Sequence, residues 1–464
     1  CSFVSAKAIA FVAAVTASVT CLTLSAAEFK DTYPKIAGIE IAGHSRVTDA
    51  SYRAQLAKHD LVILGLWRGW SGKDNATGRN MLLRDLVVDI KSKARNAGNN
   101  GILVGKYTLF NESPSTRDWA KSDEYDKLSS ERGPGGASRD WWARNSAGGN
   151  VSQWSGTWHT NVTRHVKRDR DGNTYPEWYA HRTYNEIISK VPELDIWYFD
   201  NIQSRPRVTA DWNGDGRDDD RNSDAVRREF RTGLMDGIKR ARQLAPSLVM
   251  MGNIDYHPFE LGGYGALQES EFKGQMIGLM EAGMGYPHSI ETWNGNTGWF
   301  TTKRMYSELV RNAQHNVAVF EVVGGRTDYK MMRYGLATAL MDNGYYYYTD
   351  VSGKEHFKSA WWFDEYDLDL GRALDAPPSA AWQRGVFMRK FENGLVLVNP
   401  KANGRQTVNI PDGYARFAGS QDPRTNSGQV ATSITLDERD GIILVRIGAV
   451  EDVKPIPPIS VTIQ

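Results

Sequence analysis

Five acidic residues lie at or near the ends of predicted β-strands, where paired carboxyl groups can carry out hydrolysis. They are Asp200, Asp255, Glu281, Glu321 and Asp350. Cleavage of a glycosidic bond needs two carboxyl groups, roughly 5–5.5 Å apart in retaining enzymes and roughly 6.5–9.5 Å apart in inverting ones. Lyases, aldolases and epimerases also place acids at strand ends, so this pattern alone leaves the reaction open.

The predicted strand over residues 194–202 carries the first of these acids. Apolar and aromatic side chains occupy both of its faces as far as Phe199, as expected of a parallel strand covered by helices. Asp200 and Asn201 follow directly. A carboxylate at the end of a buried strand is costly unless it is hydrogen-bonded or faces a polar site. Asp200 therefore either belongs to an active site or caps the next loop.

The elements that must position these acids alternate between strand and helix. Strands are predicted over residues 36–41, 61–66, 102–109, 194–202, 248–252, 275–280, 317–322 and 344–349, and helices over residues 48–60, 80–97, 223–244, 302–314 and 328–341. Eight such strands predict a (β/α)8 TIM barrel over residues 28–378, whose active site lies at the C-terminal ends of the strands. A doubly wound open sheet is the alternative, but no Gly-rich phosphate-binding fingerprint follows the first strand.

A second unit is predicted over residues 379–450. Pro377 and Pro378 mark its boundary, and Asn393-Gly394 is a hairpin turn between two apolar segments. Further short strands over residues 407–410, 415–418, 432–436 and 441–447 predict a small antiparallel β-sandwich domain packed on the barrel. Residues 451–464 form a Pro-rich tail.

Residues 1–27 are predicted to be a signal peptide. Lys7 precedes the apolar residues 8–15, and a small-residue cleavage site ends at Ala27. We expect the mature chain to begin near Glu28 and to be secreted or periplasmic; an uncleaved anchor is the alternative. Both cysteines, Cys1 and Cys21, lie in this segment, so residues 28–464 hold no thiol nucleophile. No second apolar run could span a membrane.

The composition favours a carbohydrate partner over a nucleic acid. The 56 basic and 55 acidic side chains nearly balance, which argues against nucleic-acid binding. The chain has 15 Trp and 20 Tyr residues, whose flat rings can stack on sugars, although many must fill the core. Trp67, Trp70 and Tyr107 are the candidates for stacking. The long, aromatic connection over residues 113–184 is interpreted as a substrate-binding lid, with plain decoration of the rim as the alternative.

One acidic loop has the pattern of a calcium site. Asp211, Asn213 and Asp215 alternate and Gly216 follows, as in the first half of an EF-hand loop. The twelfth position is Asn222 instead of a bidentate Glu, so a solvated acidic turn is the alternative. No cofactor is expected for catalysis: the nine histidines form no H-x-H or H-E-x-x-H pair, although clustering in space stays open.

Three segments resemble the α-galactosidase-type barrel superfamily. Ile196-Trp197-Tyr198-Phe199-Asp200-Asn201 is similar to its fourth-strand motif, Met276-Ile277-Gly278-Leu279-Met280-Glu281 to its sixth-strand motif, and the segment from Phe391 to Pro400 to its accessory β domain. The chain as a whole, over residues 35–447, resembles the hypothetical bacterial glycosyl hydrolases, in particular the group numbered fifteen.

The resemblance implies a glycoside hydrolase with Asp200 as nucleophile and Glu281 as general acid/base. The superfamily usually has Asp at the second position, so Glu281 departs from its pattern, and a structural role for Glu281 is the alternative. Asn201, Asp255 and Asp350 are expected to bind sugar hydroxyls, and Glu321 to bind substrate or to orient the other acids. We expect a monomer acting on a poly- or oligosaccharide. A catalytically inactive, glycan-binding barrel is the non-enzymatic alternative.

Overall fold

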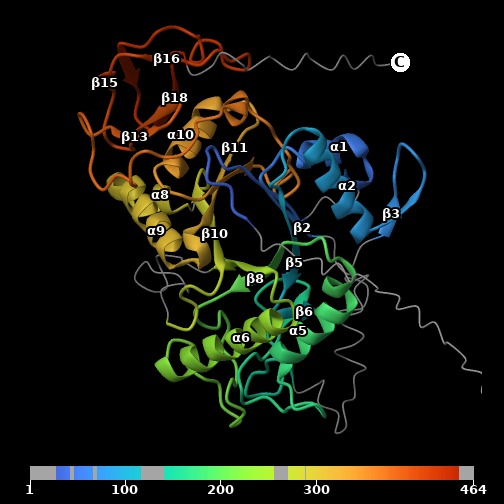
Figure 1. Ribbon diagram of the computed structural model, residues 1–464. Coiled ribbons are helices and arrows are strands. Elements are labelled where there is room, and N and C mark those ends of the chain that lie inside the picture. Colours follow the sequence, from blue (N-terminus) through green and yellow to red (C-terminus); the bar gives the residue numbers. More distant parts are fainter. Residues whose placement is uncertain are drawn as a thin grey trace, which may run out of the picture.

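The computed structural model describes residues 28–41, 46–65, 71–115, 141–254, 270–287 and 289–448 (Figure 1). The predicted signal peptide and the Pro-rich tail lie outside the described residues. So do three of the predicted site residues, Trp67, Trp70 and Asp255.

Eight parallel strands form the central sheet. They are β1 (Ala37–Glu40), β2 (Leu61–Leu64), β5 (Leu103–Leu109), β8 (Ile196–Ile202), β9 (Val249–Ile254), β10 (Ile277–Met284), β11 (Ala318–Gly324) and β12 (Tyr345–Asp350), and they pair in this order. A parallel bridge between Ile36 and Tyr346 joins the first strand to the last, and the backbone amide of Tyr346 donates to the carbonyl of Lys35 at 2.8 Å. This closure confirms the predicted (β/α)8 barrel.

Alternation of side chains along the strands fills both sides of the barrel wall. In β12, Tyr345 and Tyr347 belong to the inner cluster with Ile63, Ile196 and Leu279. Tyr346 and Tyr348 belong to the outer cluster that the helices cover. Because both faces are buried, the strands read as continuous apolar runs. A polar side chain at their C-terminal ends therefore lies beside a packed core.

The α-helices that cover the barrel are α1 (Ala50–Leu56), α2 (Leu83–Asn96), α5 (Tyr175–Glu186), α6 (Asp224–Leu244), α8 (Ile290–Trp293), α9 (Gly298–Asn312) and α10 (Tyr329–Leu340), with short 3-10 helices at Arg46–Thr48, Ile188–Lys190, Gly295–Thr297, Gln314–Asn316 and Asp364–Asp367. Five of these α-helices correspond to predicted ones, whereas α5 and α8 were not predicted. As predicted, Ser223 caps α6, and its hydroxyl accepts from the amide of Val226 at 3.3 Å. No helix of the described part is long and apolar enough to cross a membrane.

Two short antiparallel strand pairs lie outside the central sheet. The first pairs β3 (Ser71–Lys73) with β4 (Asn80–Leu82), so the predicted helix over residues 80–97 begins three residues later than expected. Asp85 accepts a hydrogen bond from the amide of Leu82 and fixes this start. The second pair joins β6 (Glu112–Pro114) to β7 (Thr157–His159), which lie far apart in the chain and flank or lie within the connection that was interpreted as a lid.

The C-terminal unit contains a four-stranded and a two-stranded antiparallel sheet, as predicted. β13 (Phe387–Phe391), β14 (Gly394–Asn399), β18 (Asp440–Arg446) and β16 (Tyr414–Arg416) form the first sheet, and β15 (Gln406–Asn409) pairs with β17 (Ser433–Leu436) in the second. Side chains from both sheets share one apolar cluster, which includes Leu397, Val408 and Ile434. This common core makes the unit a β-sandwich.

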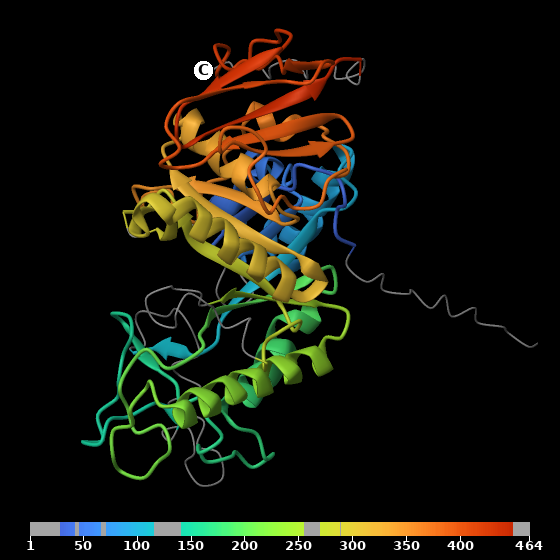
Figure 2. The same cartoon turned by 90° about the vertical axis from the view of Figure 1, so that its left-hand side faces the viewer.

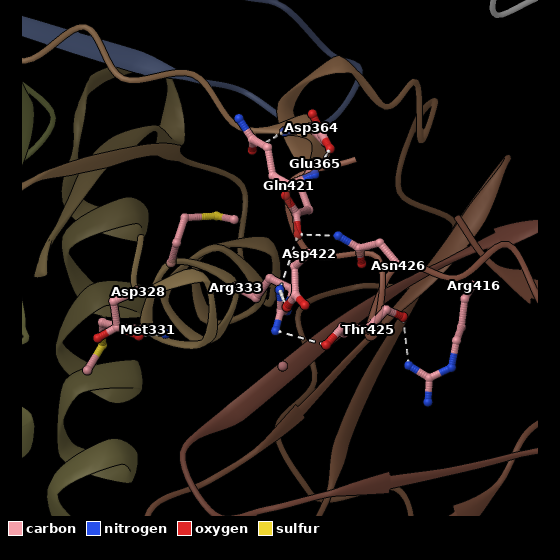
Figure 3. A network of polar contacts seen from close by, with 12 residues as sticks. Asp328, Met331, Arg333, Asp364, Glu365, Arg416, Gln421, Asp422, Thr425 and Asn426 are labelled. Atoms are coloured by element: carbon pink, nitrogen blue, oxygen red, sulfur yellow. Dashed lines mark hydrogen bonds and ion pairs between the residues drawn. The ribbon is translucent and has the colours of Figure 1, made fainter. Parts of the chain in front are cut away.

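The sandwich packs against α10, on the opposite side of the barrel from α5 and α6 (Figure 2). Arg333 of α10 is buried in this interface. Its guanidinium donates to Asp422 at 2.7 Å and to Thr425 at 3.3 Å, and it lies 3.6 Å from Glu365 (Figure 3). A buried ionic network therefore stabilises the interface in addition to apolar packing.

Candidate active site

Asp200 and Glu281 both lie where the barrel strands are irregular. The pairing of β8 with β9 shifts register between Phe199 and Ile202, a segment that includes Asp200. The pairing of β10 with β11 shifts between Met280 and Met284, a segment that includes Glu281. Register shifts of this kind turn a side chain away from the regular alternation and are common beside active sites. Both strands run past their acids: β8 ends at Ile202, as predicted, whereas β10 continues to Met284, four residues beyond its predicted end.

The carboxylate of Asp200 is held by several donors. The Tyr107 hydroxyl donates to Oδ2 at 2.5 Å, and the amide of Asn201 donates to Oδ1 at 2.9 Å. Asn253 of β9 also donates to this carboxylate. Burial raises the pKa of Asp200, and these three hydrogen bonds oppose that rise because they favour the ionised form.

Fewer hydrogen bonds stabilise the ionised form of Glu281 than that of Asp200. Asn253 Nδ2 donates to its Oε2 at 2.6 Å. Burial raises the pKa of Glu281 to about 7, and the negative charges of Glu321 and Asp200 act in the same direction. The amide of Asn253 therefore contacts both acids, and the donors around them favour a charged Asp200 and a protonated Glu281.

Glu321 forms a second polar pair next to Glu281. Its carboxylate is fully buried, and His356 Nε2 lies 3.0 Å from Oε1. The Tyr286 hydroxyl lies 2.7 Å from the same ring nitrogen. Burial lowers the pKa of His356, but the hydrogen bond and the charge of Glu321 outweigh it, so that the pKa is raised overall.

Glu281, Glu321 and His356 also form the group of described side chains that could hold a metal ion. Their potential ligand atoms all lie within 4.8 Å of one another. One imidazole and two carboxylates suit a transition metal. The sequence contained no histidine pair that would have pointed to this cluster, because the three residues come from β10, β11 and the loop after β12.

Glu112 is a third carboxyl group close to Asp200. It is almost completely buried; its Oε1 accepts from Asn201 Nδ2 at 3.1 Å and its Oε2 from the Thr157 hydroxyl at 2.9 Å. Burial raises its pKa to about 7, and the charge of Asp200 contributes to the rise. Asn201 lies between the two acids in the left-handed region, with φ of 57°.

The structure gives several predicted substrate-binding residues other partners. The ring of Tyr107 is buried and stacks on Tyr198 at 5.5 Å, so it cannot serve as an open stacking surface; it holds Asp200 instead. The carboxylate of Asp350 accepts from the amides of Ser352 and Glu355 and caps the loop that follows β12. Asn201 points to Glu112, and Glu321 to His356.

The acidic loop after β8 is closed by its own backbone. Asp211 accepts from the amides of Gly214, Asp215 and Gly216 at 2.7–3.0 Å, and Asn213 donates to Asp219 at 3.0 Å. Among the described residues, the acidic side chains of this loop do not bring three ligand atoms within 4.8 Å of one another, as Glu281, Glu321 and His356 do. Oxygen ligands remain concentrated in it, so calcium binding stays a prediction.

Sequence reasoning missed Asn253, Glu112, His356 and Tyr286. Asn253 directly follows the predicted end of the fifth strand, and Glu112 lies three residues beyond that of the third, so their positions were a usable signal. His356 and Tyr286 lie in connections whose course no local pattern predicts.

A comparison with known protein families gives a match. A family model described as hypothetical glycosyl hydrolase family 15 matches residues 107–395, which is more than half of the chain. None of the curated proteins compared with the chain matches it.

Similar solved structures include three carbohydrate-active proteins. The GH36 alpha-galactosidase AgaA from Geobacillus stearothermophilus is 12% identical, with a TM-score of 0.44 over 90% of this chain and 56% of the galactosidase. This chain thus spans about half of that protein. The glycoside hydrolase domain of PelA from Pseudomonas aeruginosa is 11% identical, with a TM-score of 0.38 over 68% of this chain and 95% of the domain. The maltogenic alpha-amylase AmyB from Thermotoga neapolitana is 12% identical, with a TM-score of 0.40 over 89% and 98%.

The family match covers the strands that carry Asp200, Asn253 and Glu281. The chain therefore belongs to the hypothetical glycosyl hydrolase family 15.

Proposed function

We propose that the chain cleaves a poly- or oligosaccharide by a retaining mechanism, with Asp200 as nucleophile and Glu281 as general acid/base. The observation that carries this proposal is the contact of both carboxyl groups with the single amide of Asn253. An amide that interacts with both carboxyl groups requires them to lie close together, as the two acids of a retaining pair do.

The hydrogen bonds around the two acids support the division of roles. Asp200 accepts from Tyr107, Asn201 and Asn253, which stabilise the carboxylate needed for attack on the anomeric carbon. Glu281 accepts from Asn253 and faces the charges of Glu321 and Asp200, so it holds its proton to a higher pH. In the first step Glu281 gives this proton to the leaving oxygen as Asp200 forms the glycosyl bond. In the second step Glu281 takes a proton from water, which releases Asp200.

Glu112 is the competing proton donor, since its pKa is raised to a similar value. Two observations favour Glu281. Both oxygens of Glu112 are engaged by Asn201 and Thr157, and its side chain is almost fully buried. Glu281 is only half-buried, so a substrate can reach it.

The test starts from a screen of the purified protein against polysaccharides, with products identified by mass. On the substrate found, Asp200→Ala should lose nearly all turnover, because no covalent intermediate can form. Glu281→Ala should slow the cleavage of poor leaving groups far more than that of activated aryl glycosides, and azide should partly restore its activity. Proton NMR of the first product should show the anomer of the substrate; the opposite anomer would exclude retention.

A glycan-binding protein without turnover is the alternative. Binding of a glycan by the wild type with no product after long incubation would favour it. Loss of turnover in Asp200→Asn with unchanged binding would favour the enzyme.

Export is part of the same proposal, because a polysaccharide substrate lies outside the cell membrane. N-terminal sequencing of the secreted protein should find a start near Glu28. A secreted protein that still begins at Cys1 would contradict removal of the leader.

A further inference from the structure

Most described tryptophans are buried or half-buried, but Trp154 is not. Trp141, Trp142, Trp197, Trp212 and Trp299 belong to the core. Trp154 and Trp293 are the described tryptophans with large exposure, each at 55%. The flat face of an exposed indole suits the C–H face of a sugar, and its N–H can donate a hydrogen bond.

The turn that carries Trp154 is firmly held. Its carbonyl accepts from the Ser152 hydroxyl at 2.6 Å and from the Thr157 hydroxyl at 3.0 Å. The amide of Ser115 donates to the carbonyl of Gly156 at 2.9 Å and extends the pairing of β6 with β7. Behind the turn, Trp158 packs edge-on against the buried Trp142 at 4.7 Å. A ring on such a fixed turn loses little conformational freedom when it binds a ligand.

Two hydrogen-bonded paths connect this turn to the strand of Asp200. In the first, Thr157 donates to Glu112, which accepts from Asn201, the residue next to Asp200. In the second, Gln203 Nε2 donates to Gln153 Oε1 at 3.2 Å, and Gln203 directly follows β8. The turn of Trp154 is thus linked by hydrogen bonds to the C-terminal end of β8, which carries Asp200.

We propose that Trp154 is the stacking surface of a glycan subsite that binds a sugar unit beyond the cleaved bond. Ser152 and Gln153 immediately precede Trp154 in the chain and carry polar side chains of the kind that bind sugar hydroxyls. The substrate would then be an extended oligo- or polysaccharide, because a single glycoside at Asp200 would not reach the turn. This inference rests on the proposed glycosidase function.

The test compares substrates of increasing length. For the wild type, kcat/KM should rise with chain length. Trp154→Ala should reduce this rise by roughly tenfold, the loss expected for one truncated aromatic contact, chiefly through a higher KM. Hydrolysis of a short aryl glycoside by the same variant should be unchanged, because that substrate does not reach the turn. Trp154→Phe, which keeps a ring, should recover most of the rise.

Trp293→Ala is the matched control, since Trp293 is equally exposed but lies on α8, where Glu291 binds Arg439 of the sandwich. It should leave the length dependence intact. An unchanged length dependence in Trp154→Ala, or an equal loss in both variants, would overturn the subsite. If the wild type hydrolyses no glycoside of any length, the proposed function fails instead; Trp154 can then still be judged by calorimetric binding of the longest oligosaccharide.

Discussion

Asn253 Nδ2 lies 2.6 Å from Oε2 of Glu281, and the same amide also donates to Asp200. The side chain stands on β9, between the strands of the two acids. It can therefore fix their spacing and stabilise the ionised form of each. A hydrogen bond to a charged group contributes about 1.5–3 kcal/mol, which makes this amide a sensitive point of the site.

Asn253→Ala should reduce kcat by about tenfold to a hundredfold, from the loss of one such bond in the transition state. Because the hydrogen bonds from Asn253 lower the pKa of both acids, its removal should move both limbs of the pH profile of kcat to higher pH. The melting temperature serves as control. A variant that loses activity without any change of the pH profile would show that Asn253 does not act on the two carboxyl groups.

The pH profile of the wild type should fall on its alkaline side through about pH 7. The reason is that the proposed general acid, Glu281, has a pKa raised to about 7 and must be protonated in the first step. With activated aryl glycosides, which need little proton donation, the activity of the Glu281→Gln variant should no longer fall on the alkaline side. Because Glu281 and Glu321 interact, the observed pKa belongs to the pair. A flat profile between pH 6 and pH 8 would contradict the assignment.

Glu112→Gln tests a buried carboxyl group of similar pKa. In the folded state its pKa is about 7, against an ordinary value of 4.5, so the folded protein binds a proton more tightly than the unfolded one. This contribution is fully present below about pH 4.5 and is lost as the pH rises through about 7. Glu112→Gln should remove it. The difference in unfolding free energy between pH 4.5 and pH 8 should then shrink by up to about 3 kcal/mol relative to the wild type.

Denaturant unfolding at both pH values measures this difference. The proposed division of roles adds a second expectation, that azide rescues Glu281→Ala and gives no rescue of Glu112→Ala. Rescue of the Glu112 variant alone would reverse the two assignments.

Much of the barrel could be read from the sequence because its signals are local. Buried parallel strands are apolar on both faces, and residues such as Ser223 and Asp328 mark helix starts by capping them. The end of β10 was less predictable than that of β8, which ends at Ile202 as predicted. Asp200 and Glu281 lie in irregular segments, and neither register shift leaves a trace in the apolar pattern.

The partners of the two acids were harder to foresee. The pairing of Asn253 with Glu281, or of Glu321 with His356, depends on barrel closure, which brings together residues far apart in the chain. The sequence could not show that the hydroxyl of Tyr107 is hydrogen-bonded to Asp200. Nor could it show that the carboxylate of Asp350 accepts from the amides of Ser352 and Glu355. Burial and hydrogen bonding decide such roles, and neither can be read from residue type alone.

Calcium binding at Asp211, Asn213 and Asp215 remains our proposal for the loop after β8. The backbone bonds of Asp211 hold the turn in a tight shape that gathers hard oxygen ligands. If the ion binds, a chelator should lower the melting temperature, and millimolar calcium should restore it. Asp215→Ala should abolish this response, whereas Asp171→Ala, a change in a different exposed acidic turn, should not. Identical melting curves with and without chelator would remove the proposal.

The buried network around Arg333 should dominate the stability of the interface between barrel and sandwich. Arg333 binds Asp422, Thr425 and Glu365, and removal of one partner of a buried ion pair leaves the other charges uncompensated. Arg333→Ala should therefore lower the unfolding free energy by about 3–5 kcal/mol. Lys330→Ala, on the same helix, breaks only the exposed 3.7 Å pair with Asp437 and should cost at most about 1 kcal/mol.

Denaturant unfolding, followed by tryptophan fluorescence, measures both variants. Because Arg333 lies at the sandwich interface and contacts none of the proposed catalytic residues, kcat at 25 °C should stay within about twofold of the wild type while the protein remains folded. Equal stabilities of the two variants would mean that apolar packing, and not the ionic network, holds the sandwich on α10.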